Sequence, residues 1–270
     1  MNTLVNSLNK VFIIAYKETT DQLEAYLQQE GFDCEVVRQE NRPEYQDFSP
    51  SYRCLLNHCR AWEKAAESQK LNLIIEADFV PVKDFGKLPL PFPKDSEKFG
   101  ISWIYTCAPQ VYWVSEEGYA QGFSTSAVAY ILSPKAASCL TEFADKIGQE
   151  TDGKVYSTWD SQIDTVLRSH NFKNFIPFRN YGEHGGIPNP EHRQNGLSPG
   201  HQADVLWGEM AFTPLYHQNY NPLGIRLKAR AKGIARLLKG NFLRRNTFKN
   251  SRVPWRLLRF SLRRQLTPRL

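Results

Sequence analysis

The sequence lacks the features that would place it at once in a disulfide, zinc, dinucleotide-binding or membrane-spanning class. Its 5 cysteines are odd in number and include no Cys-x-x-Cys pair, so we expect buried thiols in a reducing compartment. It has no glycine-rich phosphate loop and no Gly-x-Gly-x-x-Gly, which argues against a P-loop kinase or a Rossmann dehydrogenase. No apolar run is long enough for a spanning helix or a signal peptide, and residues 11–16 fit a first strand.

Acidic residues are missing from the last part of the chain. Residues 210–270 contain 15 Lys and Arg and no Asp or Glu, whereas residues 1–209 contain 19 Lys and Arg and 28 Asp and Glu. The formal net charge of +6 therefore conceals an acidic body and a strongly basic end. Such a basic segment usually meets an anionic surface.

The length and composition predict a folded body with an appendage. A chain of 270 residues with 41% apolar and 13% aromatic residues can bury one substantial core. Its first third alternates predicted strands and helices at 11–16, 20–30, 34–38, 50–67 and 71–76. This β-α-β-α-β order predicts parallel pairing with helices on the faces. Further strands are expected at 111–114, 127–132 and 175–178, and further helices at 134–148, 158–169, 223–238 and 253–266.

The predicted strand at 71–76 ends beside two acids, Glu76 and Asp78, which are separated by Ala77. Two carboxylates crowded at a strand end are unfavourable unless a cation or hydrogen-bond donors compensate them. Mg²⁺ and Mn²⁺ prefer such oxygen ligands together with substrate phosphates. The pattern therefore suggests a metal site, and the alternative is a surface strand end with two solvated acids.

Three blocks of the sequence occur in the order found in a known enzyme family. Residues 51–78 combine a cysteine-containing helix start, His58, a tryptophan and an apolar strand that ends in acids. This stretch resembles the central signature of glycosyltransferase family 25, the lipopolysaccharide-type glycosyltransferases. Residues 129–140 resemble the strand and following helix of that family, and Trp159-Asp160 resembles its aspartate before an amphipathic helix. The resemblance covers roughly residues 10–170.

The resemblance implies a GT-A-like single α/β domain with a mostly parallel central sheet. It implies a hexosyltransferase of glycan or lipopolysaccharide biosynthesis that uses a nucleotide-sugar, with a UDP-sugar favoured. The acceptor would be a lipid-linked or cell-surface glycan. Mn²⁺ or Mg²⁺ would be held by Glu76 and Asp78. Inversion at the anomeric carbon requires a base, and Asp160 is the candidate.

Other candidate site residues follow from their place in the chain. Tyr16 and Lys17 lie at the end of the first predicted strand, where ligands of parallel sheets bind, and a donor base and phosphate are their expected partners. His58 is predicted to contact the donor because it lies in the family-like block. A long stretch at 179–203 carries three histidines and is expected to be a structureless lid. The residues placed there or next to it are His201, as a third metal ligand, and His184 and Asp204, as substrate or lid residues, while His192 is given no role.

The basic end predicts two amphipathic helices. The apolar stripes are Leu227, Ala231, Ile234 and Leu238 in the first and Trp255, Leu258, Leu262 and Leu266 in the second. Basic amphipathic helices with tryptophan suit the membrane interface. We therefore expect a catalytic domain at 1–217 and a membrane-surface tail at 218–270, in a cytoplasmic protein peripheral to the inner face of the membrane.

Alternatives stay open for the tail and for the whole chain. The tail could bind nucleic acid, although the body is acidic and shows no nucleic-acid module, or it could pack on a partner subunit. The whole protein could be a catalytically weak, glycosyltransferase-like binding module, as Ala77 suggests. It could also be a polyanion-binding protein that acts through its tail.

Overall fold

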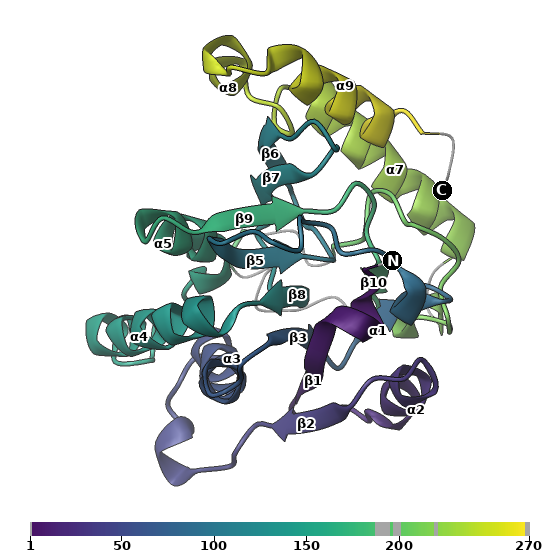
Figure 1. The fold of residues 1–270 in the computed structure, drawn as a ribbon. Helices are drawn as coiled ribbons and strands as arrows, with labels where there is room; N and C mark the ends of the chain where they lie inside the picture. The colour runs from purple at the N-terminus through teal and green to yellow at the C-terminus, as the bar shows by residue number, and fades with distance from the viewer. Residues whose placement is uncertain (1, 187–194, 197–200, 219–220, 268–270) are drawn as a thin grey trace.

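A computed structural model describes residues 2–186, 195–196, 201–218 and 221–267, so His192 lies outside the described residues. Its centre is an eight-stranded sheet of order β2-β1-β3-β8-β5-β9-β7-β6 (Figure 1). In that order the strands are Cys34–Arg38, Leu8–Ala15, Leu71–Glu76, Ala129–Leu132, Phe99–Trp103, Lys173–Ile176, Ala120–Phe123 and Gln110–Val114. A separate two-stranded sheet pairs β4 (Phe79–Pro81) with β10 (Gly182–His184).

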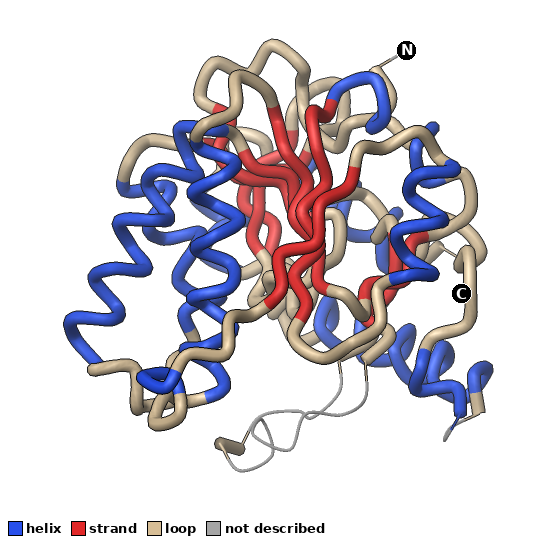
Figure 2. Tube along the Cα trace, turned by 90° about the horizontal axis from the view of Figure 1, so that it is seen from below, coloured by secondary structure: helices blue, strands red, loops and turns tan. Residues whose placement is uncertain are grey.

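Helices lie on both sides of the central sheet (Figure 2). The helices of the body are α1 (Leu4–Ser7), α2 (Asp21–Gln29), α3 (Pro50–Ala66), α4 (Pro134–Thr151) and α5 (Ile163–Ser169). α3 and α4 pack together in a core with Trp62 and Leu140, while α2 belongs to a second core on the opposite side with Phe79 and Phe85. Short 3-10 helices occur at Pro43–Tyr45, Phe85–Lys87, Trp159–Gln162 and Leu215–Gln218.

The first third of the chain forms the predicted α/β unit. β1 pairs with both β2 and β3 in parallel. The helix expected at 50–67 begins at Pro50, and the Ser49 hydroxyl caps it by accepting a hydrogen bond from the backbone N–H of Tyr52. The carboxyl ends of β1 and β3 therefore meet at one edge of the sheet, which is where the candidate site lies.

The prediction of a mostly parallel sheet is wrong, because the sheet is mixed. β8 runs antiparallel to both β3 and β5, and β7 runs antiparallel to both β6 and β9. Parallel neighbours need a crossover of a dozen or more residues, usually a helix. Residues 77–133 contain no α-helix, so their strands cannot be joined in that way. The structureless stretch expected at 179–203 also differs from the structure, because residues 182–184 form β10.

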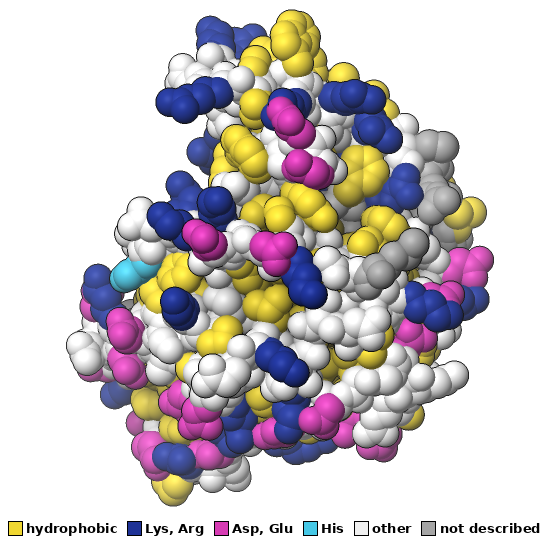
Figure 3. Space-filling model, viewed as in Figure 1, with side chains coloured by type: hydrophobic (Ala, Val, Ile, Leu, Met, Phe, Trp, Pro, Cys, Tyr) yellow, Lys and Arg dark blue, Asp and Glu magenta, His cyan; other side chains and the backbone are white. Residues whose placement is uncertain are grey.

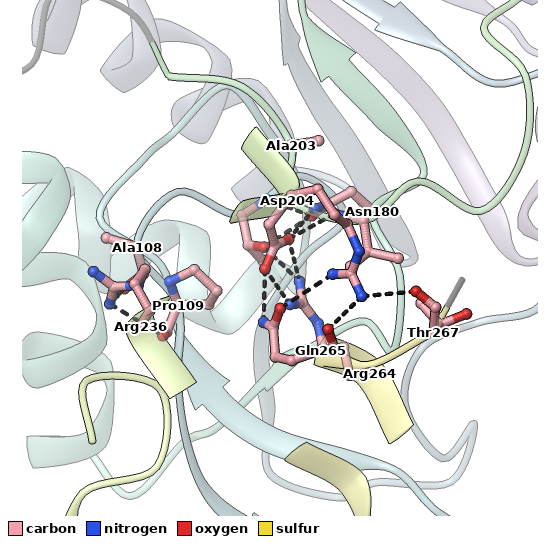
Figure 4. Close-up of polar contacts among 12 residues, drawn as sticks. Ala108, Pro109, Asn180, Ala203, Asp204, Arg236, Arg264, Gln265 and Thr267 are labelled. Atoms are coloured by element: carbon pink, nitrogen blue, oxygen red, sulfur yellow. Dashed lines mark hydrogen bonds and ion pairs between the residues drawn. The ribbon is translucent and has the colours of Figure 1, made fainter. Parts of the chain in front are cut away.

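The C-terminal helices are α7 (Pro222–Leu238), α8 (Arg245–Asn250) and α9 (Pro254–Gln265), and α7 lies beside α9 (Figure 1). Buried ion pairs fasten α7 and α9 to the body. Arg226 donates to Glu183 at 2.6 Å, and Arg264 forms a bidentate pair with Asp204 (Figure 4). Gln265 also donates to Asp204 at 2.7 Å. The division at residues 217 and 218 stays a prediction, but these contacts cross it.

Both long C-terminal helices turn the face opposite their predicted apolar stripe toward the rest of the molecule. α7 buries Arg226, Ala229, Arg230 and Gly233, whereas Leu227 and Leu238 of its apolar stripe are 51% and 81% exposed. α9 buries Leu257, Phe260 and Arg264 and leaves Trp255 of its apolar stripe exposed. None of the helices in the described ranges combines the length and the apolar character needed to cross a bilayer.

Breaking the Arg264–Asp204 pair is predicted to destabilise the fold strongly. Arg264→Met leaves the Asp204 carboxylate buried without its cation, and loss of one partner of such a pair costs about 3–5 kcal/mol. Urea denaturation followed by circular dichroism measures this change. Adding Asp204→Asn should cost less than the sum of the two single changes, because the two side chains contact each other.

Arg256→Met is the matched control, because Arg256 pairs with the exposed Glu116 and such pairs contribute about 0–1 kcal/mol. Equal losses from Arg264→Met and Arg256→Met would contradict the structural role of the buried pair.

Candidate functional site

The end of β3 brings Glu76 and Asp78 to the edge of the sheet, and the β4–β10 pairing adds a histidine. β3 ends at Glu76, and the next residue is held against β1 by a hydrogen bond from the Ala77 N–H to the carbonyl of Ile14. β4 starts at Phe79 and pairs with His184 of β10 in antiparallel register. His184 Nε2 consequently lies 3.0 Å from Asp78 Oδ2.

Glu76, Asp78 and His184 form a cluster in which each side chain offers one potential metal-ligating atom. These three atoms all lie within 4.8 Å of one another. Burial alone would lower the pKa of His184, but the charge and hydrogen bond of Asp78 raise the pKa to about 9. Burial likewise would raise the pKa of Asp78, and His184 lowers it below its usual value. The metal-free pair is thus an imidazolium and a carboxylate.

The unpaired atoms of the cluster and the space around them both suit a divalent cation. Asp78 Oδ1 is buried and has no hydrogen-bond partner among the described residues, although the other oxygen, Oδ2, lies 3.0 Å from His184 Nε2. Gly186 covers the pair closely, since a Cβ there would collide with the Asp78 carboxylate. Two carboxylates and one imidazole suit Mn²⁺ or another first-row ion, and Mg²⁺ would use the oxygens. The imidazole must lose its proton before it can ligate a metal.

A pocket of about 350 Å³ opens beside Glu76 and Asp78. Residues from the ends of β1 and β3, the start of α3 and the segments between them line it. They are Ile14, Ala15, Tyr16, Glu18, Gln39, Pro50, Arg53, Cys54, Asn57, Glu76, Ala77 and Asp78. The Lys17 ammonium lies 4.9 Å from the centre of the exposed Tyr16 ring. The pocket therefore presents an aromatic ring and an arginine on the same side of the sheet as the acids.

His58 is fully buried, and its ring contacts the carboxylate of Glu76. Trp62 Nε1 donates to the Tyr130 hydroxyl at 2.7 Å, and that hydroxyl lies 2.9 Å from His58 Nδ1. His58 Nε2 lies 3.3 Å from Glu76 Oε1. If the Tyr130 O–H donates to Nδ1, His58 carries its proton on Nε2 and donates to Glu76. The predicted donor-contact residue is thus absent from the pocket lining and lies in a position that orients Glu76.

Asp160 lies in the short 3-10 helix before α5, and its carboxylate accepts a hydrogen bond from the N–H of Ser161 at 2.8 Å. Burial raises the pKa of Asp160 to about 6, and the charge of Glu76 also raises it. A carboxylate with a pKa near 6 is ionised at neutral pH and is more basic than an exposed aspartate. Asp160 is not among the described residues that line the pocket.

The structure gives the other predicted residues different places. The backbone carbonyl of His201 accepts a hydrogen bond from the Tyr105 hydroxyl and lies 3.3 Å from His184 Nδ1, and the ring of His184 rather than that of His201 joins the two acids. Asp204 lies in the buried network with Arg264 and does not line the pocket. His192 lies outside the described residues.

Arg53 was missed at the level of the sequence, and His184 was assigned to the substrate or lid and not to the two acids. Arg53 sits one helical turn before Asn57 on α3, so its four-residue spacing from a pocket-lining residue was a usable signal. No local signal identifies His184 as the partner of Asp78. Their contact depends on the pairing of β10 with β4, two strands that are about 100 residues apart.

No protein-family model matches the chain, and no curated protein matches it. Among solved structures, the chain is similar to a glycosyltransferase involved in glycosylation of the major capsid of PBCV-1. That match has a TM-score of 0.42 and 12% identity, and it covers 62% of this chain and 81% of the other.

A second similarity is to a mutant of Drosophila β1,4-galactosyltransferase 7 in complex with manganese, UDP-Gal and xylobiose. It has a TM-score of 0.36 and 10% identity, and it covers 69% of this chain and 74% of the other. At these TM-scores and identities, neither similarity assigns a family or an activity to the chain. Membership of family 25 stays a prediction.

Gly186→Ala is predicted to separate Asp78 from His184. The added Cβ occupies the position of the Asp78 carboxylate, so the ion pair that raises the pKa of His184 is lost. The pKa of His184 should fall from about 9 toward its ordinary 6.5 in an NMR titration of the histidine ring protons. Gly208→Ala is the control, because a Cβ at Gly208 meets no atom within 4 Å. An unchanged His184 pKa in Gly186→Ala would refute the close packing of this glycine.

Proposed function

We propose that the protein is a metal-assisted glycosyltransferase that moves a sugar from a nucleotide-sugar, with a UDP-sugar favoured, to a glycan acceptor. One observation carries the proposal. An unpaired Asp78 oxygen, Glu76 and His184 converge at a strand end beside a pocket that also holds Tyr16 and Arg53. The resemblance of residues 51–78 to the family 25 signature selects this reaction among the reactions that such a site can support.

In this proposal each side of the pocket contacts a different part of the donor. The Tyr16 ring stacks on the base, and the cations of Arg53 and Lys17 meet the phosphates. Glu76, Asp78 and His184 hold Mn²⁺ or Mg²⁺, which would neutralise the charge that develops on the departing diphosphate. His58 keeps the Glu76 carboxylate turned toward the metal.

The proposed base is Asp160, which takes the proton of the acceptor hydroxyl as that oxygen attacks the anomeric carbon. Its raised pKa, about 6, suits this role because proton transfer is most efficient when the pKa lies near the working pH. Attack from the face opposite the departing diphosphate would invert the anomeric configuration.

We also propose that the acceptor is a lipid-linked or cell-surface glycan, of the lipopolysaccharide kind, and that the protein works at the cytoplasmic face of a membrane. The exposed apolar stripes and basic side chains of α7 and α9 support this location.

One observation favours a second candidate, a catalytically weak binding module. Ala77 stands where the family-like signature has its middle acid, and its side chain packs against the core.

Asp78→Asn is predicted to weaken metal-dependent donor binding sharply while the fold survives. The change keeps the volume of the side chain but removes the ligand charge next to the unpaired oxygen. Isothermal titration with UDP-sugars, with and without Mn²⁺, measures the effect. We expect Glu76→Gln to have a smaller effect than Asp78→Asn.

Asp84→Asn is the matched control, because Asp84 is exposed and pairs with Lys87 at the surface. Donor turnover by Asp78→Asn at the rate of the parent would defeat the metal assignment. Metal-dependent binding without any turnover of the parent protein would favour the binding module instead.

Asp160→Asn is predicted to abolish transfer and to leave donor binding nearly intact, because a base acts on the acceptor. In the parent, kcat/KM should rise as the pH increases through about 6, since Asp160 must lose its proton to act as a base. Transfer assays over a pH series, together with donor titrations, separate these two effects.

Asp145→Asn on the exposed side of α4 provides the control for removing a carboxylate. Loss of donor binding in Asp160→Asn would move Asp160 into the metal site. Loss of folding would mean that Asp160 only stabilises the start of its helix.

A further inference from the structure

α7 packs through arginine and not through leucine, whereas α9 buries Leu257 and Phe260 together with Arg264 and still carries an outward apolar stripe. α7 buries Arg226, which donates to Glu183 of the body, and Arg230, which donates to the carbonyl of Thr267 after α9 at 2.8 Å. Its Leu227 and Leu238 face outward. A surface helix normally turns its apolar stripe toward the core. The outward stripe therefore calls for a contact that the body does not supply.

α9 carries the clearest outward stripe. Trp255, Leu262 and Leu266 are 75%, 39% and 58% exposed, and Leu258 between them is half-buried. Their spacing of three or four residues places them on one face of the helix. Figure 3 shows hydrophobic side chains standing among Lys and Arg side chains over the α8 and α9 end of the molecule.

Exposed cations border these stripes on both helices, and no acid accompanies them. They are Lys228, Lys232 and Lys239 on α7 and Arg252, Arg259 and Arg263 on or beside α9. None of the six forms an ion pair with a described residue, whereas Arg256 pairs with Glu116 of the body. Their positive charge is thus available to an anionic partner.

A shallow pocket of about 440 Å³ lies at the C-terminal end of this face. Phe178, Arg179, Leu262, Arg263, Leu266 and Thr267 line it. The guanidinium carbons of Arg179 and Arg263 lie 5.5 and 6.0 Å from the centre of the Phe178 ring. Two cations thus flank one aromatic ring beside two exposed leucines. This combination suits a ligand that is anionic at one end and apolar at the other.

We propose that the outer face of α9, together with the Phe178–Arg179–Arg263 pocket, docks on an anionic phospholipid bilayer. Trp255, Leu262 and Leu266 enter the interface between headgroups and acyl chains. The guanidinium group of Arg263 binds a headgroup phosphate beside the Phe178 ring, while Arg252 and Arg259 meet the surface charge. The outer face of α7 adds Leu227 and its lysines to the same membrane contact.

The chemistry of this face favours a bilayer over the other polyanions and over a second copy of the chain. A nucleic-acid backbone would engage the arginines, but it offers no apolar surface to cover the leucines. A second copy of this face would bring together cations that have no acids to pair with. A bilayer supplies both the negative charge and the apolar layer. The proposal concerns a surface and does not depend on the proposed sugar transfer.

Cosedimentation with vesicles tests the proposal on the full chain. One set of vesicles contains equal parts of phosphatidylcholine and phosphatidylglycerol, and the other contains phosphatidylcholine alone. The variants are Trp255→Ser/Leu262→Ser/Leu266→Ser for the stripe and Arg259→Gln/Arg263→Gln for the cations. Lys146→Gln/Lys154→Gln/Val155→Ser, on exposed residues of α4 and the loop after it, is the matched control.

The parent and the control should pellet with the anionic vesicles and hardly with neutral ones. Arg259→Gln/Arg263→Gln should bind about tenfold to thirtyfold more weakly, because each basic residue near an anionic surface contributes about fivefold. The stripe variant should be released completely by high salt, whereas the parent is released only in part. Brominated phosphatidylglycerol should quench fluorescence of the parent and lose this quenching component in Trp255→Ser.

Four results would overturn the proposal. One is the absence of any pelleting with anionic vesicles, and another is pelleting that none of the α9 variants changes. The third is tighter binding to duplex or single-stranded nucleic acid than to vesicles, and the fourth is a dimer in sedimentation velocity that the stripe variant abolishes. Mn²⁺ and UDP-sugar titrations should give the same result for the parent and all variants. Failure of the membrane proposal can therefore be distinguished from failure of the proposed sugar transfer.

Discussion

Two buried arginine–carboxylate pairs, Arg226–Glu183 and Arg264–Asp204, hold α7 and α9 to the rest of the chain. Removing such charges from water costs several kcal/mol for each ion, so these pairs need further hydrogen bonds to compensate. Both pairs have such hydrogen bonds. The N–H groups of Ala203 and His184 donate to Glu183. Asn180 and Gln265 donate to Asp204. The pairs therefore specify an arrangement more than they add net stability.

The arrangement that they specify includes the candidate site. Glu183 is the central residue of β10, and its carboxylate accepts hydrogen bonds from the backbone N–H groups of His184 and Ala203. Because β10 pairs with β4, this support fixes His184 opposite Asp78 at the end of β3. Three distant parts of the chain thus build one cluster. The position of α7, near the C-terminal end of the chain, therefore influences the geometry of the Asp78 carboxylate.

The sequence predicted local features well and long-range pairings poorly. The predicted bounds of β2 and β3 match the structure, and Glu76 and Asp78 lie at a strand end as expected, because apolar runs and their ends are local signals. The prediction of a mostly parallel sheet was wrong, because β8 and β7 run antiparallel to their neighbours and strand order depends on connections and not on composition. His184 was not assigned to the acids, because its place is set by a pairing across about 100 residues. The buried arginines were also missed, since Arg normally stays at the surface and is buried here with partners such as Glu183 and Asp204.

The burial of arginine also decides which face α7 and α9 present to the outside. A helix has one face to bury, and on α7 guanidinium groups occupy that face, so Leu227 and Leu238 point outward. On α9 Arg264 shares the buried face with Leu257 and Phe260, and Trp255, Leu262 and Leu266 lie on the exposed face. An outward apolar stripe is unfavourable in water, by about 25 cal/mol for each Å² left exposed, so a monomer in water gains nothing from it. The same two ion pairs therefore account both for the position of His184 and for an apolar, cationic outer surface. That surface costs free energy until a partner covers it, and a bilayer that carries negative charge can satisfy its leucines and its arginines together.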